Sequence, residues 1–341
     1  MAKRTMMLFK RRLFKRRLYP MKLPAWPTDE GPFHAGEQAA QALHGVREAM
    51  AETGRRVIRT VMPLQHRELF RLLPFIALSG VDARGQPQAT LLAGRPGFVT
   101  APDQQTLRVD ALPPGGDPLA AVLAVGAQVA VLGIELPTRR RNRANGVVMA
   151  LDANGFTVRV RQSFGNCPRY IQVRELLRPA PEAGGAAAPP RQSDRLDAIS
   201  RALARSADTF FIATHAAGDR ASGGSDISHR GGRPGFVRVG DDGRTLVWPE
   251  FAGNLYFNTL GNLLLQARAA IVVPDFERGD LLHVSGRCEI EWAGREVEAF
   301  AGAQHLVRMS VDQVLLRPAA WPLRWRLIEP SPWLLETGRW E

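Results

Sequence analysis

A repeated order of short segments is the feature that most constrains the fold of this 341-residue chain. The run Gly94-Arg-Pro-Gly-Phe-Val99 returns as Gly232-Arg-Pro-Gly-Phe-Val237, 138 residues later. Three shorter matches keep nearly the same spacing: Phe75-Ile-Ala with Phe211-Ile-Ala, Thr106-Leu with Thr245-Leu, and Ala130-Val-Leu with Ala270-Ile-Val. Because the spacing drifts by only a few residues, one structural unit of about 140 residues is present twice.

Each copy of the unit reads as a series of short strands. In the first copy, seven apolar and β-branched runs lie between Phe75 and Val160, separated by turn residues. This pattern is typical of antiparallel barrels. Two helical stretches precede it, one from about Gln38 to Thr53, ended by Gly54, and one from Pro63 to Leu73. We therefore expect a mainly β fold with short helices, in which two homologous β-barrels pack as an intrachain pseudo-dimer.

The repeat and the segments around it predict the domain boundaries. A basic tail and an N-terminal helical extension occupy residues 1–55, and the first barrel occupies residues 56–178. A linker over residues 179–195 separates it from the second barrel, residues 196–341. The linker is rich in proline, alanine and glycine, as flexible connections are.

The basic tail accounts for most of the net charge. Residues 1–20 contain eight lysines and arginines and no acid, against a net charge of +12 for the whole chain. They repeat Leu-Phe-Lys-Arg-Arg at a period that fits neither a helix face nor a strand. We interpret this segment as a dispensable tail or an over-extended start before Met21. The alternative is an anchor to an anionic surface.

Composition excludes several classes of protein. Apolar residues make up 45% of the chain and charged residues 23%, as in globular proteins. No apolar stretch approaches the roughly 20 residues that span a bilayer. No signal-peptide core follows the basic N-terminus, so we expect a cytoplasmic protein without a membrane partner. Cys167 and Cys288 lack the paired spacing of a disulfide framework or a zinc site, and we expect no metal.

The two copies differ where polar residues gather. The second has Asp226-Ile-Ser-His-Arg-Gly231 where the first has Gln88-Ala-Thr-Leu-Leu-Ala93, and Asn258-Thr259 where the first has Pro118-Leu119. Arg230 can form charge-assisted bonds to a phosphate, and a helix that begins near Asn258 would point free N–H groups at it. The sequence therefore predicts an anion site in the second copy, unless Asn258 is an ordinary N-cap and Arg230 a solvated strand residue.

The first copy carries a complementary motif near its end, Phe164-Gly-Asn-Cys-Pro-Arg-Tyr-Ile-Gln172. With Ser228-His-Arg-Gly-Gly-Arg-Pro-Gly-Phe-Val237 and Asn258-Thr-Leu-Gly-Asn262, this motif resembles the pyridoxamine 5′-phosphate oxidase-like FMN-binding split-barrel superfamily. The resemblance is greater to its tandem, predicted flavin-nucleotide-binding branch, and it covers most of the chain after about residue 30. It implies two tandem split β-barrels with FMN in the groove between them.

The resemblance also implies which residues hold the cofactor. The second barrel would bind the phosphate, and the C-terminal segment of the first would close over the flavin. The implied residues are Ser228, Arg230, Asn254, Asn258, Thr259 and Asn262 in the second barrel, and Arg169, Tyr170 and Gln172 in the first. No catalytic side chain is implied, because a flavin carries the redox chemistry itself.

Several other features allow more than one interpretation. The basic patch from Arg139 to Arg143 is either a solvated hairpin turn, for which Asn145-Gly146 is a strong signal, or a surface for an acidic substrate, a nicotinamide phosphate or a redox partner. His34 and Glu37 are either neighbours of a helix cap or part of the flavin pocket. Cys167 is interpreted as a small buried residue. Four tryptophans are interpreted as apolar cover for the barrel pair: Trp321, Trp325, Trp333 and Trp340.

We therefore expect an FMN-dependent oxidoreductase whose substrate is not vitamin B6. True pyridoxamine phosphate oxidases carry an Arg-x-His signature near the C-terminus, and this chain has Arg317-Pro-Ala-Ala-Trp321 at that place. The alternative is a non-catalytic flavin-binding or electron-transfer module that serves a separate reductase. A deazaflavin in place of FMN and association into a homo-oligomer stay open. Nucleic-acid binding is not expected, because it would depend on the basic tail alone.

Overall fold

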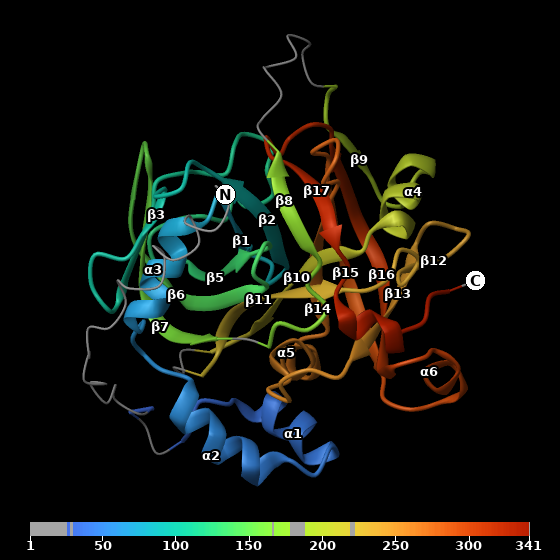
Figure 1. Cartoon of the computed structure of the whole chain (residues 1–341), viewed down its shortest axis with the longest axis horizontal. Helices are drawn as coiled ribbons and strands as arrows, with labels where there is room; N and C mark the ends of the chain where they lie inside the picture. The colour runs from blue at the N-terminus through green and yellow to red at the C-terminus, as the bar shows by residue number, and fades with distance from the viewer. Residues whose placement is uncertain (1–25, 28–29, 166, 178–187, 219–221, 341) are drawn as a thin grey trace, which may run out of the picture.

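The computed structural model describes residues 26–27, 30–165, 167–177, 188–218 and 222–340. It is mainly β, with antiparallel sheets and short helices (Figure 1). The predicted basic tail over residues 1–20 lies outside the described residues, as does most of the predicted linker over residues 179–195. Within the described ranges, no helix combines the length and the apolar character needed to cross a membrane.

The first seven strands form one antiparallel sheet, here called the N-terminal sheet, in the order β2-β1-β5-β6-β7-β4-β3. Its strands are β1 (Phe75–Val81), β2 (Pro87–Ala93), β3 (Val99–Thr100), β4 (Thr106–Val109), β5 (Gln128–Glu135), β6 (Arg140–Asp152) and β7 (Gly155–Gly165). Both faces of β1 are buried. Ile76 and Leu78 point into the core of this sheet, while Phe75 and Ala77 pack toward the second sheet, as the two-residue period of a strand requires.

The second sheet, here called the C-terminal sheet, has the order β11-β10-β14-β15-β16-β13-β12. Its strands are β10 (Thr209–Ala216), β11 (Gly224–Gly231), β12 (Arg238–Val239), β13 (Thr245–Phe251), β14 (Arg268–Pro274), β15 (Leu281–Glu291) and β16 (Ala303–Arg317). If β1 to β7 are matched in turn with β10 to β16, the two orders are the same. The segments that repeat in the sequence therefore occupy equivalent places in two sheets of one topology.

Three short strands lie outside this pattern. β9 (Arg191–Ser193) pairs with β16. β8 (Val173–Leu177) follows the last strand of the N-terminal sheet and β17 (Arg324–Glu329) follows the last strand of the C-terminal sheet, and these two pair with each other. The ribbon that they form links the two halves of the chain.

Three helices precede the N-terminal sheet: α1 (Ala35–Leu43), α2 (Arg47–Val57) and α3 (Leu64–Leu72). α3 confirms the predicted helix from Pro63 to Leu73. The single helix predicted from Gln38 to Thr53 is wrong, because the chain turns between α1 and α2 at Gly45, where φ is +66°. Gly54 does not end α2 but lies within it, and an added Cβ there would come 2.4 Å from the ring of Phe33. This glycine therefore allows α2 to pack closely against Phe33 and does not end the helix.

The N-terminal arm, defined here as α1 and α2, packs against α5 of the C-terminal half (Figure 1). The other helices are α4 (Ala198–Ser206), α5 (Asn258–Leu265), α6 (Arg295–Ala299) and the 3₁₀ helix η1 (Pro332–Glu336). A Cβ added to Gly36 of α1 would lie 2.0 Å from the carbonyl oxygen of Gly261, and one added to Gly261 would lie 2.5 Å from the amide nitrogen of Glu37. The two helices therefore meet backbone to backbone.

The hydrophobic core has three main parts. One apolar cluster lies within each sheet, and a third lies between them, where Phe75 and Leu132 meet Phe211 and Val272. Trp321 and Trp325 are buried in this third cluster, as the prediction of apolar cover requires. Of the other two tryptophans, Trp340 is partly buried against the C-terminal core and Trp333 is 41% exposed, so the prediction is wrong for Trp333.

The predicted hairpin turn at Asn145-Gly146 is also wrong. Both residues lie inside the long strand β6, at a bulge in its pairing with β7. A Cβ added to Gly146 would come 1.9 Å from the carbonyl oxygen of Arg159, so glycine is needed here for close approach of two strands. The strand carries Arg141 and Arg143 inward between the sheets instead of presenting them on a solvated turn.

Candidate functional site

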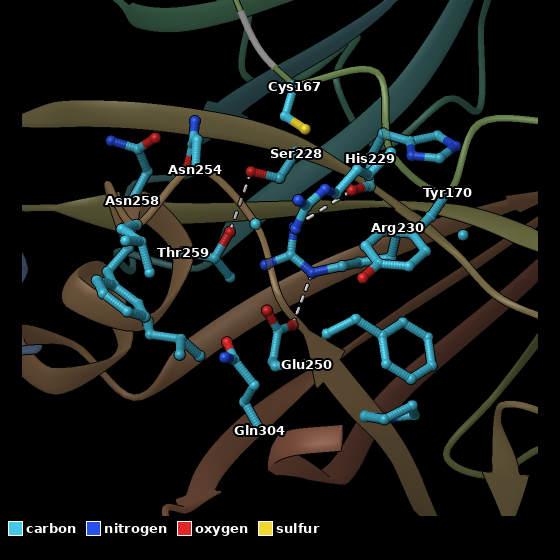
Figure 2. Close-up of a pocket in the computed structure, with 18 of the residues that line it drawn as sticks. Cys167, Tyr170, Ser228, His229, Arg230, Glu250, Asn254, Asn258, Thr259 and Gln304 are labelled. Atoms are coloured by element: carbon cyan, nitrogen blue, oxygen red, sulfur yellow. Dashed lines mark hydrogen bonds and ion pairs between the residues drawn. The ribbon is translucent and has the colours of Figure 1, made fainter. Parts of the chain in front are cut away.

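A cavity lies between the two sheets at the start of α5 (Figure 2). The N-terminal half contributes β6 and the segment after β7, and the C-terminal half contributes β11, β13, the start of β16 and α5 with the loop before it. Its lining side chains include Arg141, Arg143, Cys167, Arg169, Tyr170, Ser228, His229, Arg230, Glu250, Phe251, Asn254, Asn258, Thr259, Gln304 and His305. The site is therefore composite, and neither half of the chain builds it alone.

Arg143 is the centre of a buried network that joins the two halves. Its guanidinium donates to Asp226 Oδ1 at 2.5 Å, to Asn258 Oδ1 at 2.9 Å and to Ser228 Oγ. Ser228 in turn donates to Asp226 Oδ2 and accepts a hydrogen bond from Thr259. Because the charge of Arg143 is paired with Asp226, this arginine mainly positions the other polar groups of the cavity wall.

Arg230 is paired as well. Its Nε donates to Glu250 Oε1 at 2.6 Å (Figure 2). The same oxygen accepts from Trp248 Nε1 at 3.3 Å. Only 19% of the Arg230 side chain is exposed. The interpretation of Arg230 as a solvated strand residue is therefore wrong, and its guanidinium lies in the cavity wall.

Arg141 differs from these two arginines because no carboxylate compensates it. Its Nε donates to the carbonyl oxygen of Cys167 at 2.8 Å, and no acidic side chain in the described part of the chain pairs with it. Burial, with the charges of Arg143 and Arg230 nearby, lowers the pKa of Arg141 to about 9. The group is therefore still a cation at neutral pH. Arg141 is partly buried, a cation without a counter-charge is costly in such a place, and an anion in the cavity would remove that cost.

Helix α5 begins at the cavity wall without a side-chain cap. Asn258 is its first residue and not an N-cap; the N-cap position is Phe257, which has a left-handed φ of +59°. Leu255 and Tyr170 are left-handed too, each with φ of +63°. Three of the five described non-glycine residues with positive φ thus line this cavity. Such backbone strain concentrates at functional sites, and free N–H groups at a helix start favour an anion.

Aromatic side chains form the opposite part of the wall. Tyr170 lies across the cavity from Asn258 and Thr259, with Arg230 between them (Figure 2). The rings of Tyr170 and Phe251 have their centroids 5.1 Å apart. The Arg169 guanidinium lies over the ring of Trp333, 4.0 Å from its centroid. The cavity thus combines cations and helix N–H groups with aromatic rings.

Seven of the nine site residues expected from the sequence line the cavity: Ser228, Arg230, Asn254, Asn258, Thr259, Arg169 and Tyr170. The other two lie outside its lining. Asn262 donates to Thr214 Oγ1 at 2.9 Å, and buried Gln172 accepts from the backbone N–H of Ser331 at 2.7 Å. The side-chain amide of Asn262 therefore links α5 to β10, and that of Gln172 links the segment after β7 to the segment before η1.

His34 and Glu37 form the cap of α1, so the cap interpretation is correct, and neither residue lines the cavity. His34 is the N-cap of α1, and its Nε2 donates to Asn262 Oδ1 at 2.8 Å. Glu37 completes the capping box and accepts a hydrogen bond from Asn258 Nδ2 at 2.5 Å. Burial raises the pKa of Glu37 to about 8. Glu37 nevertheless fixes the amide of Asn258, which lines the cavity.

Cys167 lines the cavity with a partly exposed side chain, so its interpretation as a buried residue is wrong. Across the described ranges, no three histidine, cysteine or acidic side chains are placed to share a metal ion. The pairing of Glu250 with Arg230 and of Asp226 with Arg143 was not predicted from the sequence, because the partners are 20 and 83 positions apart and no local pattern indicates such pairs. Arg141 was indicated only as part of the basic patch, for which two interpretations were open.

Comparison with known proteins adds little to this geometry. No protein-family model and no curated protein matches the sequence. Among solved structures, HupZ of Group A Streptococcus is 19% identical with a TM-score of 0.28, over 35% of this chain and 98% of that one. A candidate pyridoxamine 5′-phosphate oxidase of Lactobacillus delbrueckii is 15% identical with a TM-score of 0.28, over 36% and 94%. The FAD binding protein of Mycobacterium smegmatis is 17% identical with a TM-score of 0.26, over 37% and 98%. Likenesses at these TM-scores carry no argument about this chain.

Proposed function

We propose that this chain is an FMN-binding flavoprotein in which two tandem split barrels hold one FMN in the cavity between them. The observation that carries the proposal is Arg141, a partly buried cation without a carboxylate partner among the described residues. It shares its cavity with the uncapped start of α5 and with three further arginines, Arg143, Arg169 and Arg230. A phosphate would compensate Arg141 and accept bonds from the helix N–H groups.

The other residues of the cavity support the same ligand. Thr259 and Ser228 add hydroxyl groups beside the helix start, and Arg143 holds Ser228 and Asn258 in place. Tyr170 and Phe251 place two aromatic rings, inclined by 37° to each other, at the far side of the cavity, where the ring system of a ligand would pack against one of them. The donor set therefore fits a molecule with a phosphate at one end and a ring system at the other.

The reaction class follows from the cofactor. Bound FMN supplies hydride or one-electron chemistry, while the residues of this chain bind it, orient it and exclude water from one of its sides. We propose an oxidoreductase with a substrate other than vitamin B6, with a nicotinamide cofactor or a redox protein as partner.

The test is the visible absorbance spectrum of the purified full chain, before and after addition of FMN, with mass identification of any molecule released on denaturation. We expect a flavin band from the wild type and a weaker band, or none, from Arg141→Leu. Arg140→Leu is the matched control, because Arg140 is the exposed neighbour on the same strand. A colourless wild type that fails to take up FMN contradicts the proposal, and release of a deazaflavin would change the cofactor but not the site.

One observation favours a non-catalytic flavin module as the second candidate. Two acid–base side chains of the cavity wall, His229 and Glu250, are not free for proton transfer. Burial holds the pKa of His229 well below its usual value, and Glu250 is bound to Arg230. Flavin reduction by NADPH without turnover of any small acceptor would support this module, whereas steady turnover would support the oxidoreductase.

A further inference from the structure

Two histidines make a contact that the proposed flavin site does not explain. His44 directly follows α1, and His305 lies near the start of β16, where it also lines the cavity. Their Nε2 atoms are 2.8 Å apart. Each Nδ1 atom faces a backbone carbonyl oxygen at 2.9 Å, that of Ala40 for His44 and that of Trp292 for His305.

These three contacts together need one more proton than two neutral rings possess. A carbonyl oxygen can only accept, so both Nδ1 atoms must carry hydrogen. The neutral rings would then present two bare Nε2 lone pairs to each other at 2.8 Å, which is repulsive. A third proton on one Nε2 turns the contact into a charge-assisted N–H···N bond. The geometry therefore corresponds to a pair of histidines that shares a single positive charge.

The surroundings fit this charge. The ring of Phe257 lies 4.4 Å from that of His44, and the ring of Trp292 lies 4.8 Å from that of His305, so aromatic faces surround the pair. Burial lowers the pKa of His305, and the neighbouring His44 lowers it further. Glu250 lies opposite His305 on β13, and α5 carries no charged residue.

We propose that His44 and His305 form a proton-linked latch, which holds the N-terminal arm against the cavity wall when the pair is protonated and releases it when the proton is lost. The latch itself does not require a bound flavin. It depends on the proposed function only for the identity of the ligand in the cavity. Because Glu37 on the same arm fixes Asn258, release of the arm would loosen the ligand site.

The sign of the pH effect follows from the proton count. The docked pair holds one proton, whereas two free histidines together hold fewer than one above their ordinary pKa of about 6.5 and more than one below it. Docking is therefore strongest near pH 6.5 and weakens as pH rises above that value. One linked proton changes the docking equilibrium by at most about tenfold per pH unit. Glu37 also titrates in α1, with a pKa of about 8, and a test must separate its contribution from that of the histidines.

The test is amide hydrogen exchange in α1 of the full chain without added flavin, between about pH 6.5 and 8.5, corrected for intrinsic exchange rates. We expect protection in the wild type to fall as pH rises. In His44→Gln, the side-chain amide can donate to His305 Nε2 without titrating, so the pH dependence should be smaller. In His44→Phe, protection should be low at every pH. All three proteins keep Glu37. The difference between their pH dependences of α1 protection therefore reports the histidine proton alone.

A second readout and a control complete the test. Ring ¹⁵N chemical shifts should show one protonated Nε2 in the pair at low pH. His215→Gln, in a half-buried histidine of β10, should leave the exchange profile of α1 unchanged. Equal pH slopes in the wild type and His44→Gln would overturn the latch. Protection that zinc restores or EDTA removes would overturn it in favour of a metal-bridged pair. These measurements are made without flavin, so they test the latch even if the protein fails to bind FMN.

Discussion

At the scale of single residues, the cavity shows that arginines of one patch have different roles. Arg143 is paired with Asp226 and Arg230 with Glu250, and both pairs are part of the wall. Arg141 bonds only to a backbone carbonyl oxygen within the described chain. Arg141 is therefore the arginine available to bind an anion, because it has no carboxylate partner among the described residues. Arg143 and Arg230 are already paired and stabilise the cavity wall.

This difference predicts opposite effects of two leucine substitutions. Arg143→Leu leaves Asp226 buried without its partner, which should lower the free energy of unfolding by about 3–5 kcal/mol. Arg141→Leu removes an uncompensated cation, so the ligand-free protein should be as stable as the wild type or more stable. Its FMN affinity should fall roughly 10- to 100-fold, the value of one or two charge-assisted bonds. Urea unfolding and flavin fluorescence titration measure the two effects, and equal destabilisation by both variants would contradict this assignment.

Glu37 predicts how stability depends on pH. Burial raises its pKa from 4.5 in the unfolded chain to about 8 in the fold. Between these values the folded protein holds a proton that the unfolded chain releases, so this contribution is complete below pH 4.5 and is lost as pH rises toward 8. Wild type should therefore lose stability relative to Glu37→Gln across this range in urea unfolding. Parallel curves for the two proteins would show that Glu37 is ionised in the fold.

At the scale of elements, close backbone contact decides how the N-terminal arm packs. α1 crosses α5 at Gly36 and Gly261, with no room for a Cβ on either helix. This contact places Glu37 against Asn258 at the first turn of α5. The arm is thus one of the parts that shape the cavity wall.

Gly261→Ala should consequently displace the arm. The added Cβ would lie 2.5 Å from the backbone nitrogen of Glu37, and backbone atoms cannot move aside as a flexible side chain can. We expect a loss of roughly 1–3 kcal/mol, as for other overpacked sites, and faster proteolysis within α1 and α2. Gly115→Ala is the control, because nothing lies within 4 Å of a Cβ at that position. An unchanged proteolysis pattern in Gly261→Ala would mean that the arm does not depend on this contact.

The elements also show where sequence patterns succeed and fail. The start of α5 at Asn258 could be predicted, because a polar pair before an apolar run is a local signal. Asn145-Gly146 gives an equally local turn signal, yet both residues lie in the 13-residue strand β6. Pairing with β5 and β7 decides that strand, and such non-local contacts override a two-residue preference. The same limit applies to Arg143, whose partner Asp226 is 83 positions away.

At the scale of the whole molecule, the two sheets share one strand order but differ in where they carry arginines. The repeat in the sequence was enough to predict that two units of the same strand series follow one another, and the two sheets have the same strand order. Pairing places Arg143 opposite Leu132, and His283 opposite Val272 at the equivalent point of the other sheet. The same match puts Leu281 in the place of Arg141. Each sheet therefore offers an equivalent position, but only β6 of the N-terminal sheet supplies these arginines.

The molecule should accordingly bind one FMN per chain. A second cavity of about 510 Å³ lies between the sheets near Asp117 and His283, and none of its described lining residues is a lysine or an arginine. Asp117 accepts from Arg317 and from Thr90, so its own charge is already paired. A phosphate would find no free cation there, and the nearby carboxylate would repel it. Calorimetric titration should give one equivalent for the wild type, and one equivalent of roughly 10- to 100-fold weaker affinity for Arg141→Leu. Two equivalents, or one whose affinity is unchanged in Arg141→Leu, would place FMN in the second cavity and refute the assignment of the arginine-lined one.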